Sequence, residues 1–361
     1  MHTRKLGNTG LMVSAIGLGC AQLASSRTGV AVEIVRRAVE LGITYFDVAR
    51  IYGDAESKLG LGLEGKRDDV VISTKTIRHT REGAWREINE SLERLRTGYI
   101  DNVHLHRLQS GEDMDRHLGP GGSLEALIEA RDQGMIHHIG CTGHRSDALI
   151  EALNRFDFEI ILVPLNIVER EPLERLIPLC QERGVGVTIM KPLATGLLPA
   201  SLALKWLLNQ PIASAVPGTT TLAELEANAA VGERPATLTT WERGVIQGFQ
   251  EKLKHVRCHL CGLCHPCPQE IDIEATLGTD EIYNHYRTMG PAAFRSFPWS
   301  SEVVDKELVK RPRRIARIEA CDGCGDCEER CPHGLPIMGM LANLLPGMRD
   351  MVSIYEELRD K

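Results

Sequence analysis

The sequence of 361 residues lacks any apolar run near the roughly 20 residues that a helix needs to cross a bilayer. Its first ten residues, MHTRKLGNTG, lack the apolar core of a secretory signal peptide. It also lacks a basic excess, since its net charge is −7, whereas nucleic acids and anionic membranes favour a basic face. We therefore expect a cytoplasmic protein that binds neither nucleic acid nor membranes.

The one cluster of basic residues in the sequence is the run KRPRRIAR (310–317). Such a run is typical of a solvated helix face, or of a segment that docks on acidic neighbours in the same chain. A nucleic-acid site is the alternative, which the negative net charge disfavours.

The chain contains 11 cysteines, and a cytoplasmic location disfavours structural disulfides. Cys20, Cys141 and Cys180 lie singly in apolar runs, which is typical of small buried side chains. The others form two groups of four, each followed by a proline: Cys258, Cys261, Cys264 and Cys267, then Cys321, Cys324, Cys327 and Cys331.

The second group has the spacing C-x2-C-x2-C-x3-C-P, which in bacterial ferredoxins binds 4Fe-4S clusters. Thiolates at every third residue can surround three corners of a cubane, and the fourth cysteine then ligates the other cluster. Tetrahedral zinc, which typically uses two separated CxxC pairs, is the alternative and fits less well. We therefore predict two 4Fe-4S clusters, one held by Cys258, Cys261, Cys264 and Cys331 and the other by Cys321, Cys324, Cys327 and Cys267.

Short β-branched runs alternate with helical patterns over the first 230 residues or so. The predicted strands are 13–20, 43–48, 70–76, 101–106, 136–142, 159–165, 186–192 and 213–218. Helical patterns between them include 83–96 and 172–184, and the second ends in a glycine typical of a helix terminus. Eight strand–helix pairs fit the size of a (β/α)8 TIM barrel. A doubly wound dinucleotide-binding sheet is the alternative, but GLGCAQ (17–22) supplies no GxGxxG after the first strand.

We predict an α/β protein with a (β/α)8 barrel over residues 1–250 and a small, mainly helical ferredoxin-type domain over residues 251–361. The aromatic-rich segment 283–304 is expected to form the core of this smaller domain, or alternatively to line a substrate site. Segment 107–122, RLQSGEDMDRHLGPGG, is interpreted as a short polar loop.

Ionisable side chains stand at the ends of three consecutive predicted strands. Asp47 ends one strand, Lys75 lies near the end of the next, and His106 ends the third, while Tyr52 follows Asp47 closely. Catalytic groups of barrels lie at these strand ends. An ammonium beside a tyrosine lowers the pKa of the phenol, which can then act as a general acid toward a carbonyl oxygen. An imidazole can orient that carbonyl. Singly, each residue also has a purely structural explanation, such as a helix cap or a buried barrel histidine.

The motifs RKLGNTGLMVSAIGLG (4–19), FDVARIYGDAE (46–56), STK (73–75), HLH (104–106) and PGTTTLAELEANAA (217–230) resemble those of the aldo-keto reductases. The resemblance extends to the subgroup with a C-terminal ferredoxin-type module. It implies a catalytic tetrad of Asp47, Tyr52, Lys75 and His106 in which Tyr52 is the proton donor. It also implies hydride transfer from a nicotinamide cofactor held across the barrel mouth.

The same resemblance implies a set of nicotinamide-cofactor contacts. They are Gly19, Cys20, Thr142, Met190, Lys191, Pro192, Leu193, Gly218, Thr219, Glu224 and Asn228. Thr142 matches a serine of the family, but Gly143 replaces the usual asparagine and Leu162 the usual glutamine. Met190 stands where many members stack an aromatic ring. The nicotinamide pocket is therefore expected to be less polar than usual.

The segment 216–230 joins the last predicted strand to a helix, and a helix N-terminus can hold a phosphate. Family members that prefer NADP place basic residues here, whereas this chain has Glu224. A carboxylate repels a 2′-phosphate and accepts from a ribose hydroxyl. We expect a preference for NAD(H) over NADP(H). The alternative is that Glu224 is an exposed helix residue and that a basic side chain comes from elsewhere.

The expected function is an NAD(P)-dependent oxidoreductase that interconverts a small-molecule carbonyl and an alcohol. Its two clusters have a structural, electron-relaying or sensing role, with a redox carrier as a possible partner. The alternative is a nicotinamide-binding redox sensor, or an electron-transfer subunit whose clusters relay electrons to a partner. No motif names the substrate, the reaction direction or the oligomeric state.

Overall fold

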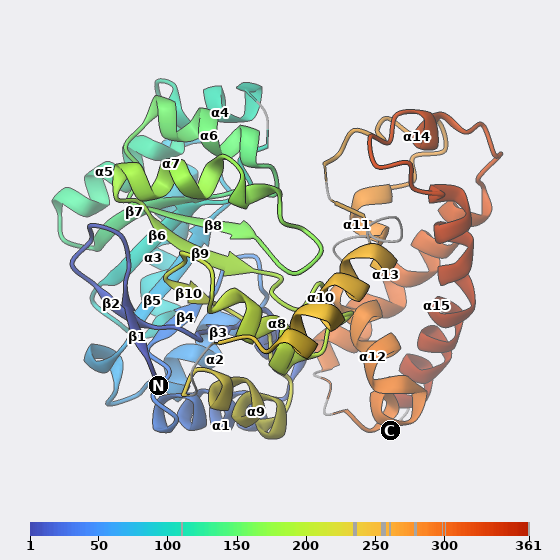
Figure 1. Cartoon of the computed structure of the whole chain (residues 1–361), viewed down its shortest axis with the longest axis horizontal. Helices are drawn as coiled ribbons and strands as arrows, with labels where there is room; N and C mark the ends of the chain where they lie inside the picture. Colours follow the sequence, from blue (N-terminus) through green and yellow to red (C-terminus); the bar gives the residue numbers. More distant parts are fainter. Residues whose placement is uncertain are drawn as a thin grey trace. The chain divides into compact units, whose positions relative to one another are not determined.

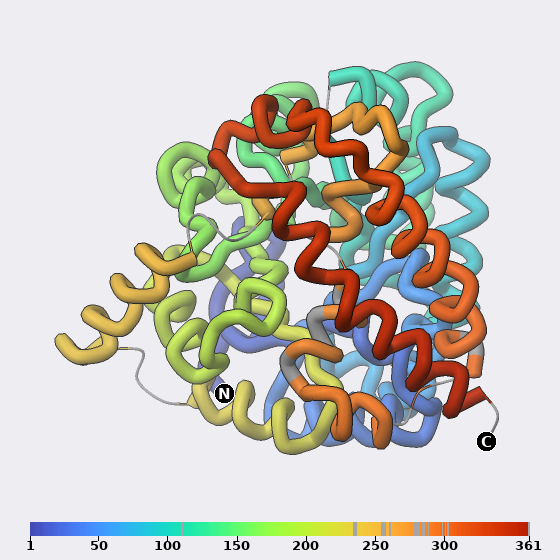
Figure 2. The backbone as a smooth tube through the Cα atoms, turned by 90° about the vertical axis from the view of Figure 1, so that its right-hand side faces the viewer, coloured from blue at the N-terminus to red at the C-terminus, as the bar shows by residue number. Residues whose placement is uncertain are grey.

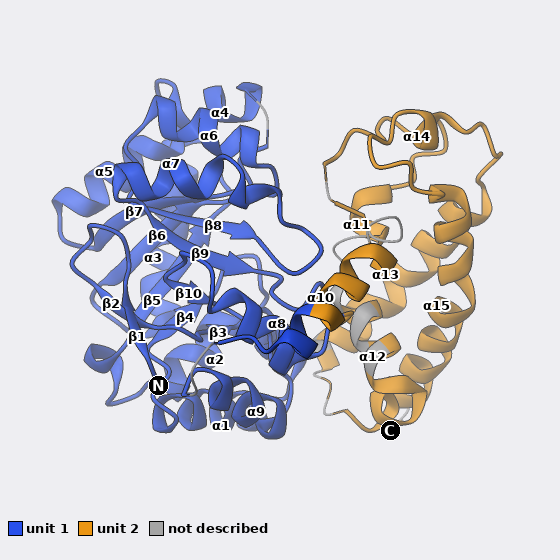
Figure 3. Ribbon diagram, viewed as in Figure 1, with its two compact units in different colours: residues 1–194, 198–243 blue, residues 195–197, 244–361 orange. Residues whose placement is uncertain are grey.

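The computed structural model describes residues 1–109, 111–233, 237–253, 258–259, 261–277, 280–297, 299 and 301–359. The chain divides into two compact units (Figure 3). Unit 1 comprises residues 1–194 and 198–243, and unit 2 comprises residues 195–197 and 244–361. Helix α10 (Thr240–Leu253) contributes to both units. The domain boundary expected after residue 250 stays a prediction.

Unit 1 is built on a sheet of eight parallel strands, with helices on its outside (Figure 1). The strands are β3 (Leu18–Gly19), β4 (Tyr45–Asp47), β5 (Val71–Thr76), β6 (Ile100–Leu105), β7 (Ile136–Thr142), β8 (Ile160–Pro164), β9 (Gly186–Met190) and β10 (Ser214–Ala215). Each strand lies beside the strands that precede and follow it in the sequence, which is typical of consecutive βαβ units. Nearly every strand residue is buried, because helices cover the outer face and side chains fill the interior.

The two edge strands of this sheet meet, so the sheet closes. Gly17 N donates to Ala215 O at 2.8 Å, and Gly19 N donates to Pro217 O at 3.0 Å. Parallel bridges join Ile16 to Ala215 and Gly19 to Gly218. The (β/α)8 barrel prediction is therefore confirmed by the strand order and its closure.

The helices of unit 1 follow the strands in alternation. They are α1 (Thr28–Glu40), α2 (Ala55–Gly62), α3 (Arg81–Leu95), α4 (Gly111–Leu118), α5 (Ser123–Asp132), α6 (Ser146–Arg155), α7 (Leu176–Arg183), α8 (Ala200–Leu207) and α9 (Leu222–Val231), with short 3-10 turns η1 (Ala21–Ser25), η2 (Arg67–Asp69) and η3 (Glu171–Leu173). In α3, Thr80 caps the first turn by accepting from Gly83 N, and Ala84, Ile88 and Leu95 form the buried stripe.

Helix α7 ends as the sequence indicates, at Gly184, whose φ of 69° is left-handed and favours glycine. Its start differs from the prediction of one helix over 172–184. A 3-10 turn, η3, precedes it, and the α-helix itself begins only at Leu176. Pro178 lacks an N–H and is tolerated in the first turn of α7, whereas a helix that began at residue 172 would place it in the interior, where it breaks the hydrogen-bond ladder.

The prediction of one strand over 13–20 is wrong in detail, because this stretch holds two strands. Strand β2 (Met12–Ser14) pairs antiparallel with β1 (Thr3–Lys5), and β3 begins only at Leu18. Leu6 and Val13 pack with Tyr45, Val71 and Ile160, which lie at the starts of barrel strands. The hairpin therefore covers the amino-terminal end of the barrel and leaves the opposite end for the site.

The prediction of a short polar loop over 107–122 is also wrong in part, because it contains helix α4. Two buried side chains, Met114 and His117, hold this helix against unit 1. Glu112 and Asp113 in its first turn and Arg116 in its last turn have the signs that favour a helix dipole. Its only two apolar side chains, Met114 and Leu118, have the i, i+4 spacing of a helix, but one such pair is too short a pattern to predict a helix.

Unit 2 is helical, and its longest helix, α15 (Ile337–Arg359), packs against α12 (Glu281–Ser296) and α13 (Ser301–Glu319) (Figure 2). Two short helices, α11 (Ile273–Leu277) and α14 (Asp326–Glu329), lie beside the cysteine loops. The core includes the aromatic side chains Tyr283, Phe294, Phe297, Trp299 and Tyr355. The aromatics of segment 283–304 thus serve as the core of unit 2. Pro298 and Ser300 of this segment lie outside the described residues.

The basic run 310–317 docks on acidic neighbours within unit 2. Arg311 is fully buried and pairs with Asp280 and with Glu307. Arg314 Nη1 also reaches Asp280, at 2.6 Å. Buried charges are stable only when paired in this way, so this run is structural. None of the helices formed by the described residues combines the length and apolar character that a bilayer crossing needs.

Candidate active site and cluster cavities

The buried ion pair between Asp47 and Lys75 is the centre of the site. Asp47 is the last residue of β4, and Lys75 is the penultimate residue of the adjacent strand β5. Lys75 Nζ donates to Asp47 Oδ2 at 2.8 Å and to Val48 O at 2.7 Å. Burial raises the pKa of the Asp47 carboxyl above its ordinary value, and the Lys75 ammonium opposes that rise.

Tyr52 lies in the turn between β4 and α2 and faces this pair. Its backbone N–H donates to Ala49 O at 3.0 Å, and its carbonyl accepts from Ala55 N at 2.9 Å, which fixes the turn. Lys75 Nζ lies 5.1 Å from the centroid of the Tyr52 ring. The His106 ring stands edge-on to the Tyr52 ring, with centroids 6.4 Å apart. The four residues expected to form a tetrad therefore converge at the carboxyl ends of β4, β5 and β6.

His106 is neutral in this setting. Burial and the nearby Lys75 charge hold the pKa of its imidazole well below the ordinary value. Its Nδ1 has no hydrogen-bond partner among the described residues. A neutral ring has one N–H donor and one lone pair, so it can donate to a substrate oxygen without being a strong acid.

His104 was not singled out from the sequence, although it belongs to the same HLH motif. It is fully buried inside the barrel, where its ring packs against Gly140 so closely that a Cβ there would collide with it. Burial holds the pKa of His104 well below its ordinary value. Because side chains alternate along a strand, His104 and His106 lie on the same inward face of the barrel. This two-residue spacing was the feature of the sequence that could have pointed to His104.

Thr142 and Arg107 join the ends of β6 and β7. Thr142 is buried at the last position of β7, and its Oγ1 accepts from Arg107 N at 2.9 Å. Arg107 has a left-handed φ of 67°, which is strained for a residue with a Cβ. Strain of this kind accumulates at functional sites. No pattern in the sequence marks a left-handed arginine, so sequence analysis missed it.

The segment after β9 carries the expected contacts Met190, Lys191, Pro192 and Leu193. Lys191 has a left-handed φ of 54°. Asn166 stabilises this conformation, since its Nδ2 donates to Lys191 O at 3.2 Å while its Oδ1 accepts from Val168 N and Glu169 N. Asn166 therefore positions the segment, a role that sequence analysis missed. Leu162, expected to replace a polar family residue, is buried in the barrel interior.

Two glycines let the edges of the barrel come together beside Cys20. A Cβ on Gly19 would lie 2.8 Å from Val216 O, and one on Gly218 would collide with the Gln22 amide. Cys20 N donates to Asp47 O at 2.8 Å, and burial raises the pKa of its thiol well above the ordinary value. The Cys20 thiol is therefore buried and neutral, and it is the backbone N–H of Cys20 that holds the end of β3 beside Asp47.

The first turn of α9 uses one carboxylate oxygen of Glu224, the residue expected to contact the ribose. Glu224 forms a capping box with Thr221, whose Oγ1 accepts from Glu224 N at 3.2 Å. Glu224 Oε2 also accepts from Thr220 N at 2.8 Å and from Thr220 Oγ1 at 2.7 Å. This oxygen is occupied by the helix terminus, and the residue is exposed. Its negative charge nevertheless remains beside the helix N-terminus.

Two buried polar residues in the same segment suit an adenine nucleotide. The Oγ1 atom of Thr219 is buried and has no hydrogen-bond partner among the described residues. Asn228 is buried on the inner face of α9. A buried hydroxyl without a partner carries a free-energy cost that a bound polar group removes. The residues present therefore fit a dinucleotide.

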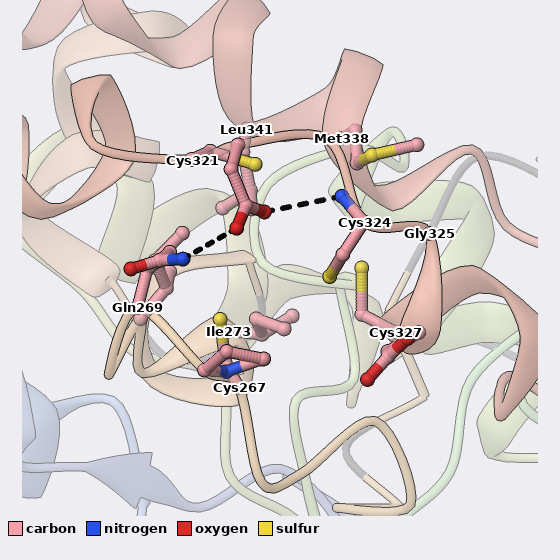
Figure 4. Close-up of a pocket in the computed structure, with 13 residues that line it drawn as sticks. Cys267, Gln269, Ile273, Cys321, Cys324, Gly325, Cys327, Met338 and Leu341 are labelled. Atoms are coloured by element: carbon pink, nitrogen blue, oxygen red, sulfur yellow. Dashed lines mark hydrogen bonds between the residues drawn. The ribbon is translucent and has the colours of Figure 1, made fainter.

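Unit 2 sorts the eight clustered cysteines into two cavities. One cavity is lined by Cys267, Cys321, Cys324 and Cys327, which border a common space in Figure 4. The other is lined by Cys258, Cys261, Cys264 and Cys331. Each cavity thus takes three cysteines from one sequence group and the last cysteine of the other, as crossed ligation requires. Four thiols around one apolar-walled cavity fit a 4Fe-4S cluster.

Asp322 fixes the loop around the first cavity. Its Oδ1 accepts from Cys324 N at 3.1 Å, and its Oδ2 accepts from Gln269 Nε2 at 2.6 Å (Figure 4). The side chain thereby joins the two cysteine-bearing segments of the chain. Such outer contacts orient metal ligands.

Comparison with known proteins agrees with this division. The Aldo/keto reductase family model matches residues 15–201, and the 4Fe-4S dicluster domain model matches residues 257–335. An uncharacterized oxidoreductase, YqkF of Bacillus subtilis, is 30% identical over 212 residues, which span 55% of this chain and 67% of that protein. L-galactose dehydrogenase of Arabidopsis thaliana is 35% identical over 225 residues, 57% of this chain and 70% of that protein.

Comparison with solved structures also matches this chain to aldo-keto reductases. The holo form of aldo-keto reductase AKR11C1 from Bacillus halodurans superposes with a TM-score of 0.61 at 28% identity. The match covers 69% of this chain and 96% of that one. The chain belongs to the aldo/keto reductase family and carries a 4Fe-4S dicluster domain after its barrel.

Proposed function

We propose that the protein is an NAD(P)-dependent oxidoreductase that interconverts a small carbonyl compound and its alcohol, with Tyr52 as the general acid and base. The observation that carries the proposal is the position of the Lys75 ammonium, bonded to Asp47 and facing the Tyr52 ring. A positive charge so placed favours the phenolate form of the tyrosine over the phenol. Proton transfer from Tyr52 then becomes less costly near neutral pH.

The residues of the chain divide the proton work between them. In reduction, the Tyr52 hydroxyl gives its proton to the carbonyl oxygen, and in oxidation the phenolate takes the proton from the alcohol. Lys75 stabilises the phenolate, and Asp47 holds Lys75 in place. The neutral His106 ring donates a hydrogen bond that orients the substrate oxygen. A bound nicotinamide supplies the hydride in reduction and accepts it in oxidation, so hydride and proton together convert C=O into CH–OH.

We further propose that Gly19, Cys20, Thr142, the segment 190–193 and the start of α9 hold the cofactor. Thr219 and Asn228 offer buried polar atoms, and Gly218 allows close approach of the backbone. The segment 216–230 contains no lysine or arginine, and Glu224 adds a negative charge beside the helix N-terminus. These features favour NAD(H), which lacks the 2′-phosphate, over NADP(H).

The similarity to L-galactose dehydrogenase makes sugars the first substrate class to test. L-galactose and related aldoses with NAD+ form one arm of the panel, and small aldehydes with NADH form the other. Reaction is followed at the nicotinamide absorption band, under anaerobic conditions that preserve the clusters.

The test of the proposal is Tyr52→Phe, with Tyr99→Phe as the control. Tyr99 lies in the same unit, and its hydroxyl donates to Asp68 at the surface. With the best panel substrate, we expect Tyr52→Phe to lose about 10²–10⁴-fold in kcat, the usual contribution of a general acid, while NADH still binds. Tyr99→Phe should retain kcat. Full activity of Tyr52→Phe would refute the assigned role.

A second candidate function rests on the two cysteine-lined cavities of unit 2, since a catalytic barrel alone does not require them. In this alternative the clusters pass electrons between nicotinamide and a partner protein. The test is the visible absorption of anaerobic protein after addition of NADH without substrate. Bleaching supports electron relay. Unchanged absorption, in clusters that dithionite does bleach, supports a structural role.

A further inference from the structure

We propose that His79, Asp113 and His117 form a binding site for a divalent transition metal of the zinc class. This site is separate from the tetrad and from the cysteine cavities. His79 lies between β5 and α3, while Asp113 and His117 lie one turn apart on α4. One ligand atom from each residue lies within 4.8 Å of the others. The site uses no residue that the proposed reaction or the clusters employ.

The distances suit three ligands around one ion. His79 Nε2 lies 3.1 Å from Asp113 Oδ1, and His117 Nε2 lies 3.9 Å from the same oxygen. The two imidazole rings have centroids 4.5 Å apart and are tilted by 46°. Ligands about 2.0–2.2 Å from a tetrahedral ion are separated by similar distances. A hydrogen bond between His79 and Asp113 alone would leave His117 Nε2, close to both residues, without a partner.

His117 is the observation that points to a metal. The residue is 1% exposed, and its Nε2 has no hydrogen-bond partner among the described residues. Its Nδ1 lies 2.6 Å from Ser123 Oγ. When Nδ1 carries the proton and donates it to Ser123, Nε2 presents a lone pair toward Asp113. Metal-binding histidines typically donate their other ring N–H in this way.

The charge state of the ring agrees with this arrangement. Burial lowers the pKa of His117 to about 4. The ring is therefore neutral near pH 7, which is the state that binds metal. Asp113 contributes the negative charge, and its Oδ2 accepts from Gln109 N at 3.2 Å, which orients the carboxylate.

The backbone holds the ligands in place without the ion. Ser123 N donates to His79 O at 3.0 Å, and Arg81 N donates to Gly121 O at 2.9 Å. Thr80 and Gly122 form an antiparallel bridge. The loop with His79 is thereby tied to the segment with Ser123, the partner of His117. A preorganised site of this kind binds an ion with little rearrangement.

The ligand set indicates which ion binds. Two imidazoles and one carboxylate suit Zn²⁺, whereas Ca²⁺ and Mg²⁺ prefer oxygen ligands. The His79 side chain is 41% exposed, so solvent can supply the fourth ligand. The ion would join the segments that follow β5 and β6, the strands that lead to Lys75 and His106.

The experiment uses the full chain with its clusters intact, purified anaerobically and incubated with Zn²⁺. After gel filtration, zinc and iron per chain are measured by mass spectrometry. The variants are His117→Gln, Asp113→Asn and His79→Asn, and the control is His137→Gln, an exposed histidine of the same unit that stacks on Tyr99. Iron content and thermal unfolding report whether each variant folds. Of the three substitutions, His79→Asn should disturb folding least, because the His79 ring is partly exposed.

We expect about one zinc per chain in the wild type and in His137→Gln, and at least a tenfold loss of bound zinc in the three ligand variants. X-ray absorption at the zinc edge should show nitrogen and oxygen ligands at about 2.0–2.1 Å and no sulfur at about 2.3 Å. Three results would overturn the proposal: zinc–sulfur scattering, equal zinc in wild type and folded ligand variants, or no zinc retained by the wild type.

Discussion

Lys75 Nζ lies 2.8 Å from Asp47 Oδ2, with the Lys75 side chain 1% exposed and that of Asp47 7% exposed. The two residues come from neighbouring strands, and Val48 O gives the ammonium a second acceptor. A buried ion pair seldom adds much stability over apolar residues, but removing one partner leaves a charge uncompensated. Removing either Asp47 or Lys75 is therefore expected to lower the stability of unit 1 and to change the charge that faces the Tyr52 ring.

We expect Lys75→Met to lower the free energy of unfolding of unit 1 by about 3–5 kcal/mol, because the Asp47 carboxylate is left buried alone. The matched control is Lys66→Met. Lys66 Nζ lies 3.4 Å from Asp69, and both side chains are more than half exposed, so a change of at most about 1 kcal/mol is expected. Urea unfolding followed by circular dichroism gives both values. Equal midpoints for the two variants would contradict the assigned role of the pair.

The stability of unit 1 should fall in mild acid. Burial holds the pKa values of His104, His106 and His144 well below the ordinary value, which is about 6.5 in the unfolded chain. Above about pH 6.5 neither state is protonated. Below it the unfolded chain takes up protons that the folded barrel does not, so stability decreases as pH falls, by at most about 1.4 kcal/mol per pH unit for each histidine.

The raised pKa of Asp47 has the opposite effect on stability. Just above the ordinary pKa of an aspartate, the folded state binds the proton more tightly than the unfolded chain, so protonation of Asp47 favours folding there. The histidines therefore dominate between about pH 6.5 and pH 5. Urea midpoints measured at pH 7.5, 6.5 and 5.5 test this, and His104→Asn should reduce the slope. A midpoint that stays constant across this range would show that the buried rings accept protons in the folded state.

Crossed ligation predicts which cysteine variants lose the same cluster. Cys267 and Cys324 line the same cavity. The variants Cys267→Ala and Cys324→Ala, and the double variant, should therefore each lose that one cluster and retain the other, with about four irons per chain. Combining Cys267→Ala with Cys264→Ala affects both cavities and should leave almost no iron. Ligation within each sequence group would reverse the two double variants, which iron analysis distinguishes.

The preference for NAD(H) over NADP(H) should change when the charge of Glu224 is removed and its size is kept. Glu224→Gln keeps a residue that can complete the capping box with Thr221. It removes the charge that repels a 2′-phosphate. We expect kcat/KM for NADP(H) to rise relative to NAD(H) by about two- to fivefold, the effect of one charge at a helix terminus. The control Glu226→Gln removes a carboxylate two positions later, which pairs with Arg37 at 2.9 Å, and it should change the ratio less. An unchanged ratio in Glu224→Gln would remove the basis for the NAD(H) preference.

Much of the fold follows from sequence patterns because barrel strands and helices are local. The β-branched runs marked the barrel strands from β4 to β10 closely. The split of 13–20 escaped prediction because β2 is defined by pairing with Thr3–Lys5, a contact that apolar periodicity does not encode. Helix α4 escaped because only two of its side chains are buried.

The site was predictable to the extent that it depends on residue types at strand ends. The capping box Thr221–Leu–Ala–Glu224 was also readable as a local signature, although we expected Glu224 to contact ribose. The left-handed backbone of Arg107 and Lys191 could not be predicted, because neither residue belongs to the types that favour positive φ, which are glycine and, less strongly, asparagine and aspartate.

The sequence by itself determined the repeated strand–helix pattern of an aldo/keto reductase barrel and the cysteine spacing of a 4Fe-4S module. A cubane needs thiolates at short fixed spacing, and a barrel repeats one strand–helix unit, so both leave local signals. Only the tertiary structure decided which groups without a sequence motif meet. Asn166 Nδ2 reaches Lys191 O, 25 residues later, and His79 Nε2 reaches Asp113 Oδ1 of α4, 34 residues later. Such contacts depend on how distant segments pack, and that packing comes from burial of the whole core rather than from any local pattern.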